Sequence, residues 1–349
     1  MAWNEAAARL ETFAAHRPRG SSVPSQRQVG VSMTAADRSR TLLRRLAWVL
    51  VVLVLAITSL SAYIRLTRAG LSCADWPQCY GASLRSAPAG AEAPAADLEI
   101  AAARLAHRIV ASSALLLVVA IVVICHASPG ARRGLRAEGR IAIALLALAL
   151  GLAVLGRWSS DARIPAVAIG NLLGGFAMFA LCWRLARDPG IGLAPGWRAW
   201  AWIATLWVAC QVALGGLVSA SFAATSCTGF ADCLGAARAL PWTALDPWRE
   251  PLLAGAPPVN ASGALAQALH RFAGVLSILV VAPLAVAAWG AGRRQAATLL
   301  VLLLAGGVAL GVQMAYDGPT LAFALAHNLA AALLAATLFD LARAPAPPR

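Results

Sequence analysis

Eight apolar runs dominate the chain, and short polar segments separate them. Each run is close to the ~20 residues that a helix needs to cross the hydrocarbon core of a bilayer. The runs cover residues 46–66, 100–124, 140–157, 164–186, 198–218, 265–290, 296–315 and 320–342. Composition agrees, because 60% of the residues are hydrophobic and only 13% are charged. The pattern predicts an all-α membrane protein with eight transmembrane helices.

Charged residues fall mainly in the gaps between these runs. The net charge of +14 comes from arginine alone, since the chain contains no lysine. Arginines concentrate in alternate gaps and most acidic residues lie in the others, which is the pattern of topology signals rather than of a nucleic-acid-binding face. By the positive-inside rule we expect both termini in the cytoplasm and two long loops outside a cell (inner) membrane. Residues 1–45 are expected to form a flexible cytoplasmic tail.

The two long loops predict an internal repeat. Each has a Ser-Cys pair, a second cysteine six positions after the first, and a glycine two positions later; the next helix of each half carries a His-Arg pair. An even number of helices per copy implies parallel copies. We therefore expect two four-helix bundles, at residues 46–190 and 191–349.

The loop cysteines are expected to form two short disulfides, Cys73–Cys79 and Cys227–Cys233, because disulfides persist outside the cytoplasm. Free thiols, or a redox relay in one pair, are the alternatives. The other cysteines lie within or at the ends of apolar runs and are expected to be small buried hydrophobes. They are Cys125, Cys182 and Cys210.

Three histidines lie at one expected depth. His107, His270 and His327 are each roughly seven residues into a helix that enters from outside, which is on the order of 10 Å below the outer surface. A lone intramembrane histidine is often a helix–helix hydrogen-bonding residue. Three in one layer favour a metal or haem, and zinc is disfavoured because the layer lacks carboxylates and thiolates. We interpret His270 and His327 as a pair that offers two imidazoles to a haem iron.

Two arginines follow these histidines in the sequence, Arg108 after His107 and Arg271 after His270. A guanidinium at this depth suits a haem propionate, which it can bind through two parallel hydrogen bonds. The alternative is that the arginines extend to the lipid head groups.

The loop sequence IRLTRAGLSCADWPQCYG, residues 64–81, resembles the signature loop of heme A synthases. The segment QVALGGLVSASFAATSC, residues 211–227, resembles the matching part of their second half, and the terminal HNLAAALL, residues 327–334, agrees too. The resemblance covers residues 46–342. It implies two four-helix bundles, with a heme b held by His270 and His327 in the second. It also implies that the first bundle oxidises the C8 methyl of heme O to the formyl group of heme A, with His107 on the substrate iron.

The first half departs from the family pattern at two positions. The family's second histidine is replaced by Gly170 or Asn171, depending on register, and its glutamate three residues before the first histidine is Arg104. Three hypotheses therefore remain: a variant synthase, a non-catalytic haem-binding or electron-transfer paralogue that aids oxidase assembly, and a transporter. The transporter is disfavoured because no acidic residue lies deep in an apolar run.

The partners follow from the same interpretation. Besides the lipid bilayer, the resemblance implies heme O synthase, oxidase assembly factors and an unidentified electron donor. A homo-oligomer is left open, and no nucleic acid is expected.

Overall fold

The computed structural model describes residues 35–68, 95–127, 129–159, 164–187, 192–252 and 260–343. This part of the chain is helical and contains no strand. The long helices are α2 (Ala35–Arg68), α4 (Ala95–His126), α6 (Arg136–Ser159), α7 (Pro165–Ala186), α8 (Pro195–Ala220), α10 (Ala264–Gly290), α11 (Arg294–Tyr316) and α12 (Leu321–Leu341). The short ones are α5 (Pro129–Gly134), α9 (Gly229–Arg238), η1 (Trp242–Leu245) and η2 (Ala261–Gly263).

Eight helices are long and apolar enough to cross a membrane, which confirms the predicted eight-helix membrane protein. Their polar ends extend some of them beyond the apolar runs: α2 begins at Ala35 rather than near residue 46. Proline opens both α7 and α8, where its missing N–H costs no hydrogen bond. The parallel repeat, the two-bundle division and the side of the membrane on which the termini lie remain predictions.

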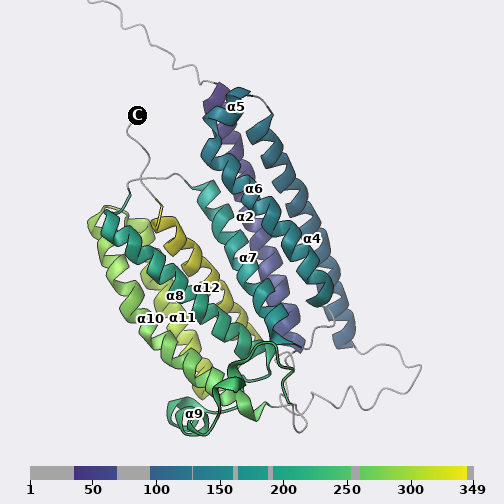
Figure 1. Ribbon diagram of the computed structural model, residues 1–349, viewed down its shortest axis with the longest axis vertical. Coiled ribbons are helices and arrows are strands. Elements are labelled where there is room, and N and C mark those ends of the chain that lie inside the picture. The colour runs from purple at the N-terminus through teal and green to yellow at the C-terminus, as the bar shows by residue number, and fades with distance from the viewer. Residues whose placement is uncertain are drawn as a thin grey trace, which may run out of the picture. The chain divides into compact units, whose positions relative to one another are not determined.

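The packing of the helices defines two neighbouring groups, visible in Figure 1. In the second half, α10 packs on α8 and α11, and α12 packs on α8 and α11. In the first half, α6 packs between α4 and α7. Helix α7 also packs on α8 and α12, and it therefore joins the two groups. One buried apolar cluster runs through both, from Leu50 and Phe179 to Leu284 and Leu338.

The segment between α8 and α10 folds over one end of the second group. Helix α9 packs on α10, and its N-cap residue Thr228 donates a backbone N–H to Asp232 at 2.8 Å. The expected disulfide between Cys227 and Cys233 is present, with the two Cα atoms 5.0 Å apart. The loop is therefore fixed directly above α10.

The remaining cysteines divide in three ways. Cys73 and Cys79 lie outside the described residues. Cys125 and Cys182 are buried, as expected. The expectation is wrong for Cys210, which is exposed on α8. Because α8 is a candidate membrane span, this small thiol side chain is one that lipid can contact.

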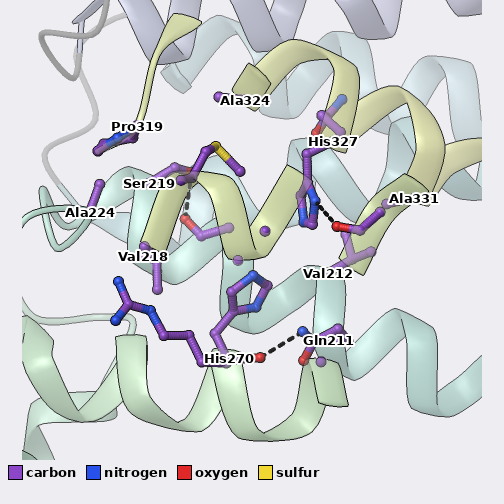
Figure 2. Close-up of a pocket in the computed structure, with 18 of the residues that line it drawn as sticks. Gln211, Val212, Val218, Ser219, Ala224, His270, Pro319, Ala324, His327 and Ala331 are labelled. Carbon is purple, nitrogen blue, oxygen red and sulfur yellow. Dashed lines mark hydrogen bonds between the residues drawn. The ribbon is translucent and has the colours of Figure 1, made fainter. Parts of the chain in front are cut away.

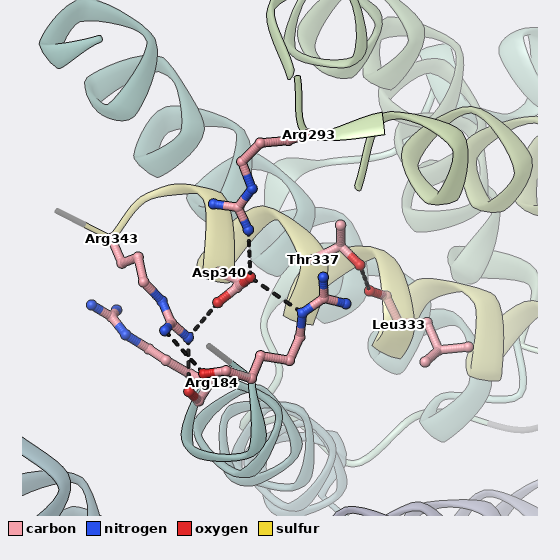
Figure 3. Close-up of polar contacts among 7 residues, drawn as sticks. Arg184, Arg293, Leu333, Thr337, Asp340 and Arg343 are labelled. Carbon is pink, nitrogen blue, oxygen red and sulfur yellow. Dashed lines mark hydrogen bonds and ion pairs between the residues drawn. The ribbon is translucent and has the colours of Figure 1, made fainter. Parts of the chain in front are cut away.

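Arginines gather around one buried carboxylate at the other end of the helices (Figure 3). Asp340 of α12 pairs with Arg293 at 3.2 Å, with Arg187 at 3.6 Å, and with Arg343. Arg343 also donates to the backbone carbonyl of Arg184 at 2.7 Å. Burial lowers the pKa of Arg343, and the neighbouring Asp340 carboxylate opposes that shift. The cluster ties the ends of α7, α11 and α12 together.

Candidate functional site

A cavity of about 270 Å³ lies inside the second group of helices. Helices α8, α10, α11 and α12 supply most of its lining, and residues of α2, α7, α9 and the adjoining loops complete it. The lining is largely apolar, with a small number of polar groups, as in most cofactor sites. Both His270 and His327 line it, and their imidazoles face one another across the space (Figure 2).

Each histidine occupies the same place in its helix. His270 is the seventh residue of α10, which begins at Ala264, and His327 is the seventh of α12, which begins at Leu321. One helix, α11, separates α10 from α12, so these two helices run in the same direction, and equivalent positions in them lie at a similar depth. Their ring centroids are 6.2 Å apart and the ring planes are 76° apart.

This separation suits a shared metal. An imidazole nitrogen lies about 2.0 Å from a metal that it ligates, and about 1.2 Å from the centre of its own ring, so two ligating imidazoles on opposite sides have ring centres on the order of 6.4 Å apart. The 6.2 Å between the rings of His270 and His327 agrees with this spacing.

The hydrogen bonds of the two rings are compatible with ligation. His327 Nδ1 lies 2.9 Å from the carbonyl oxygen of Gly307, which as acceptor fixes the proton on Nδ1 and leaves Nε2 as the free lone pair. His270 Nδ1 is buried and has no hydrogen-bond partner among the described residues. A buried imidazole nitrogen without a partner is costly, so His270 Nδ1 is a polar atom that the described residues leave unpaired beside the cavity.

Small residues make room for the rings. A Cβ on Gly215 of α8 would lie 2.9 Å from Cε1 of His270, and a Cβ on Gly311 of α11 would lie 3.7 Å from Cε1 of His327. Gln211, one helical turn before Gly215, donates to the backbone carbonyl of His270 at 2.7 Å. The glycines and the glutamine therefore fix how α10 and α12 present their imidazoles.

The donor set favours haem over a bare metal ion. No group of three or more His, Cys, Asp or Glu side chains that could hold a metal occurs in the described ranges. A structural or catalytic zinc needs at least three protein ligands. Haem iron already has four ring nitrogens and needs only axial ligands from the protein, so two facing imidazoles are sufficient.

Two arginines bring positive charge to the cavity. Arg271 donates to the carbonyl oxygen of Gly229 and to the disulfide sulfur of Cys233, the latter at 2.9 Å. Arg65 of α2 donates to Asn328 at 3.4 Å. Because no aspartate or glutamate is among the described lining residues, the cavity carries a positive charge.

The residues expected to act in the first half do not line this cavity. His107 is half-buried on α4 and lies thirteenth in the helix, because α4 begins earlier than the apolar run. Arg104 and Arg108 are exposed, and Asn171 is half-buried on α7. The structure places them on these helices without bringing them into a described pocket.

Gly170 shows a contrast with the second half. A Cβ on Gly170 would lie 3.0 Å from Leu155, and one on Gly174 would lie 2.5 Å from Leu152. Leucines of α6 therefore pack against the glycines of α7, and Leu155 would have to shift to admit a larger side chain at position 170.

Sequence reasoning missed Arg65, Gln211 and Asn328 as parts of the cavity. Arg65 had a visible signal, because it interrupts the apolar end of a predicted membrane helix, which is costly. Gln211 and Asn328 are uncharged and had no comparable signal. Their importance depends on contacts between helices far apart in the sequence.

The chain is similar to known proteins over most of its length. The chain is 28% identical over 332 residues to a protein of Shewanella oneidensis named heme A synthase, covering 84% of this chain and 94% of that protein. Residues 44–339 match the family described as cytochrome oxidase assembly protein, COX15-CtaA. The matched residues include His270, His327, the Cys227–Cys233 loop and α2 from residue 44 onward. The chain belongs to the COX15-CtaA family of cytochrome oxidase assembly proteins.

Proposed function

We propose that this protein acts in heme A biosynthesis as a heme A synthase-type membrane oxidoreductase. Its second half would hold a heme b, and its first half would bind heme O as substrate. The observation that carries the proposal is the pair His270 and His327, whose rings face each other across a cavity at the spacing that a shared iron requires. The 28% identity to a heme A synthase supports the same reaction class.

The cavity residues have separate roles in this proposal. His270 and His327 would hold the haem iron through their imidazole nitrogens. Gly307 orients the ring of His327 through its carbonyl, and Gln211 holds the α10 backbone at His270. Arg271 is placed to pair with a propionate, and its bonds to Gly229 and Cys233 connect it to the loop above. A haem bound here would supply one-electron transfer.

The reaction assigned to the first half is oxidation of the C8 methyl of heme O to the formyl of heme A. His107 would hold the substrate iron, and Asn171 or Gly170 stands where the family has a second histidine. Arg104, at the position of the family's glutamate, cannot act as a base because its guanidinium stays protonated. Arg104 and Arg108 would instead bind anionic groups of the substrate. An oxidant and an electron donor, both unidentified, are also required.

A second candidate is a haem-binding or electron-transfer paralogue without synthase activity. The observation that favours it is that Leu155 of α6 packs against Gly170, with its Cδ2 3.0 Å from where a Cβ would lie. One ligand, His107, would remain on that side, and a single axial ligand leaves an iron position open.

Localisation and partners follow from the proposal. An eight-helix membrane protein in this pathway would lie in the cell (inner) membrane, with the cysteine loops on the outer side. Heme O synthase and oxidase assembly factors would be its partners, and a homo-oligomer is compatible with the exposed apolar surfaces of α4 and α10.

Haem analysis of the purified protein tests the proposal. The protein is produced in a host that supplies heme O, and extracted haems are identified by liquid chromatography and mass spectrometry. Heme A or its hydroxylated intermediate, present with heme b, supports the synthase. Heme b with unchanged heme O supports the paralogue, and absence of any haem contradicts both.

A further inference from the structure

Arg65 is a cation inside a candidate membrane span, Arg38–Thr67, and it belongs to the first half of the chain. Its helix nevertheless packs on the second half: Ala62 and Leu66 form a buried cluster with Leu321, Ala324 and Leu325 of α12. This packing brings the guanidinium to the cavity that contains His270 and His327.

The hydrogen bonds of Arg65 are incomplete. Its Nη2 donates to Asn328 Oδ1 at the long distance of 3.4 Å, and its Nε is buried without a partner among the described residues. A guanidinium has five N–H donors and does not lose its proton in proteins, so it cannot neutralise itself. A charge in this position is costly unless an anion pairs with it.

The second cation of the cavity, Arg271, comes from α10 of the second half. Arg271 directly follows His270 in α10, and Arg65 contacts Asn328, which directly follows His327 in α12. Each imidazole therefore has one guanidinium associated with it. Both arginines line the cavity, and no carboxylate does so among the described residues.

We propose that Arg65 and Arg271 form a subsite for two carboxylates, each guanidinium binding one propionate of the haem held between His270 and His327. The inference rests on the proposed function for the haem itself. It adds that helix α2 of the first half completes the cofactor site of the second half. Arginine suits this position because its planar fork binds a carboxylate through two parallel hydrogen bonds.

Haem esters provide a direct test. Apoprotein in detergent is titrated with heme b and with its dimethyl ester, in which both carboxylates are neutral, and affinity is followed by the Soret absorbance. The wild type is expected to bind the ester more weakly. Arg65→Gln should weaken binding of heme b by about 10- to 100-fold, the range for a charge-assisted hydrogen bond. It should change binding of the ester by less than about threefold, since the ester offers no charge to lose.

Two further variants make the result specific. Arg65→Lys keeps the positive charge but cannot make two parallel hydrogen bonds to one carboxylate, so it should recover part of the preference for heme b over the ester. The same variant replaces Arg65→Gln in the titration if Arg65→Gln does not fold. Arg238→Gln, on exposed helix α9, is the control and should bind both haems as the wild type does.

Each outcome has one meaning. Equal weakening of heme b and ester by Arg65→Gln would overturn the inference and assign Arg65 a structural role or another anion, such as a lipid phosphate. No weakening of either would also overturn it. A wild type that binds neither haem would contradict the proposed function, and this result is separate because it requires no variant.

Discussion

Leu155 packs directly on Gly170, so that even a methyl group on this glycine would lie 3.0 Å from Leu155 Cδ2. The second half has the opposite arrangement of sizes. There α12 carries the bulky His327, and α11 opposes it with Gly311, where a Cβ would lie 3.7 Å from the ring. In both halves one large and one small side chain fill the contact, because interiors are close-packed. In the second half the large side chain, His327, belongs to α12 and the glycine to α11. In the first half the large side chain, Leu155, belongs to α6 and the glycine to α7, so Leu155 occupies the space beside Gly170.

Loss of either cavity histidine should remove the low-spin spectrum of the bound haem. In His270→Ala or His327→Ala the iron would keep one axial ligand and become five-coordinate. Absorption and electron paramagnetic resonance spectra of the purified variants measure this. His126→Ala is the matched control, because His126 bonds to the backbone of its own helix at Val122, outside the cavity lining. An unchanged low-spin spectrum in either cavity variant would refute the assignment.

Three glycines give a graded test of the space around the imidazoles. Gly215→Ala should lower haem affinity by roughly 10-fold or more, because its Cβ would lie 2.9 Å from the ring of His270 and displace a ligand. Gly311→Ala should have little effect, since 3.7 Å is an ordinary contact. Gly306→Ala meets nothing within 4 Å and is the control. Equal affinities in all three variants would show that His270 does not need its present position.

The sequence was sufficient to predict the eight spanning helices, because about 20 consecutive apolar residues have few other stable arrangements. It was less informative at the helix ends. Helix α2 begins at Ala35 and continues through Arg44 and Arg45, ahead of the apolar run, and α9 is too short and polar to stand out in the loop. In both places local polarity suggests loop, while the backbone remains helical.

The site residues that could be predicted from the sequence are those whose placement in a membrane costs the most free energy. His270 and His327 are conspicuous because histidine in an apolar run needs a reason. Arg65 lies in such a run too, but its role depends on the packing of α2 against α12, more than 250 positions away in the chain. Asp340 looked like an ordinary charge at a helix end, and only the structure shows three arginines around it.

Removal of the loop disulfide should weaken haem retention as well as the fold. In Cys233→Ser with Cys227→Ser, unfolding should become easier by about 2 kcal/mol, the order expected for a short closed ring. Haem should also dissociate faster, because Arg271 donates to Cys233 and Gly229 in the same loop. Thermal melting and transfer of haem to apomyoglobin measure the two effects. Mass spectrometry of the unreduced wild type should show the Cys227–Cys233 and Cys73–Cys79 disulfides. Free thiols at all four positions would contradict the prediction that the two loops are closed by disulfides.

Asp340→Asn should destabilise the protein without changing the haem spectrum. The substitution removes the carboxylate charge that pairs with Arg187, Arg293 and Arg343, and it leaves their charges close together. Breaking a buried ion pair costs about 3 kcal/mol or more, so the melting temperature should fall by several degrees. Thr337→Ala, one turn away on α12, removes only an intrahelical bond to Leu333 and serves as the control. A lost haem spectrum at full stability would show instead that the cluster acts on the cavity.

His107→Ala distinguishes the two candidate functions. If the protein is a synthase, His107 is the histidine left in the first half to hold the iron of heme O. The variant should then slow conversion by at least ~10-fold and leave the low-spin heme b signal intact, because His107 does not line the cavity of His270 and His327.

Arg104→Glu restores the family's acid at an exposed position of the same helix. Activity gained by Arg104→Glu would identify a weakened synthase, and activity lost would show that Arg104 has taken a role in binding the substrate. If the wild type converts no heme O with any donor, and His107→Ala changes neither haem content nor spectrum, catalysis is rejected and the paralogue stands.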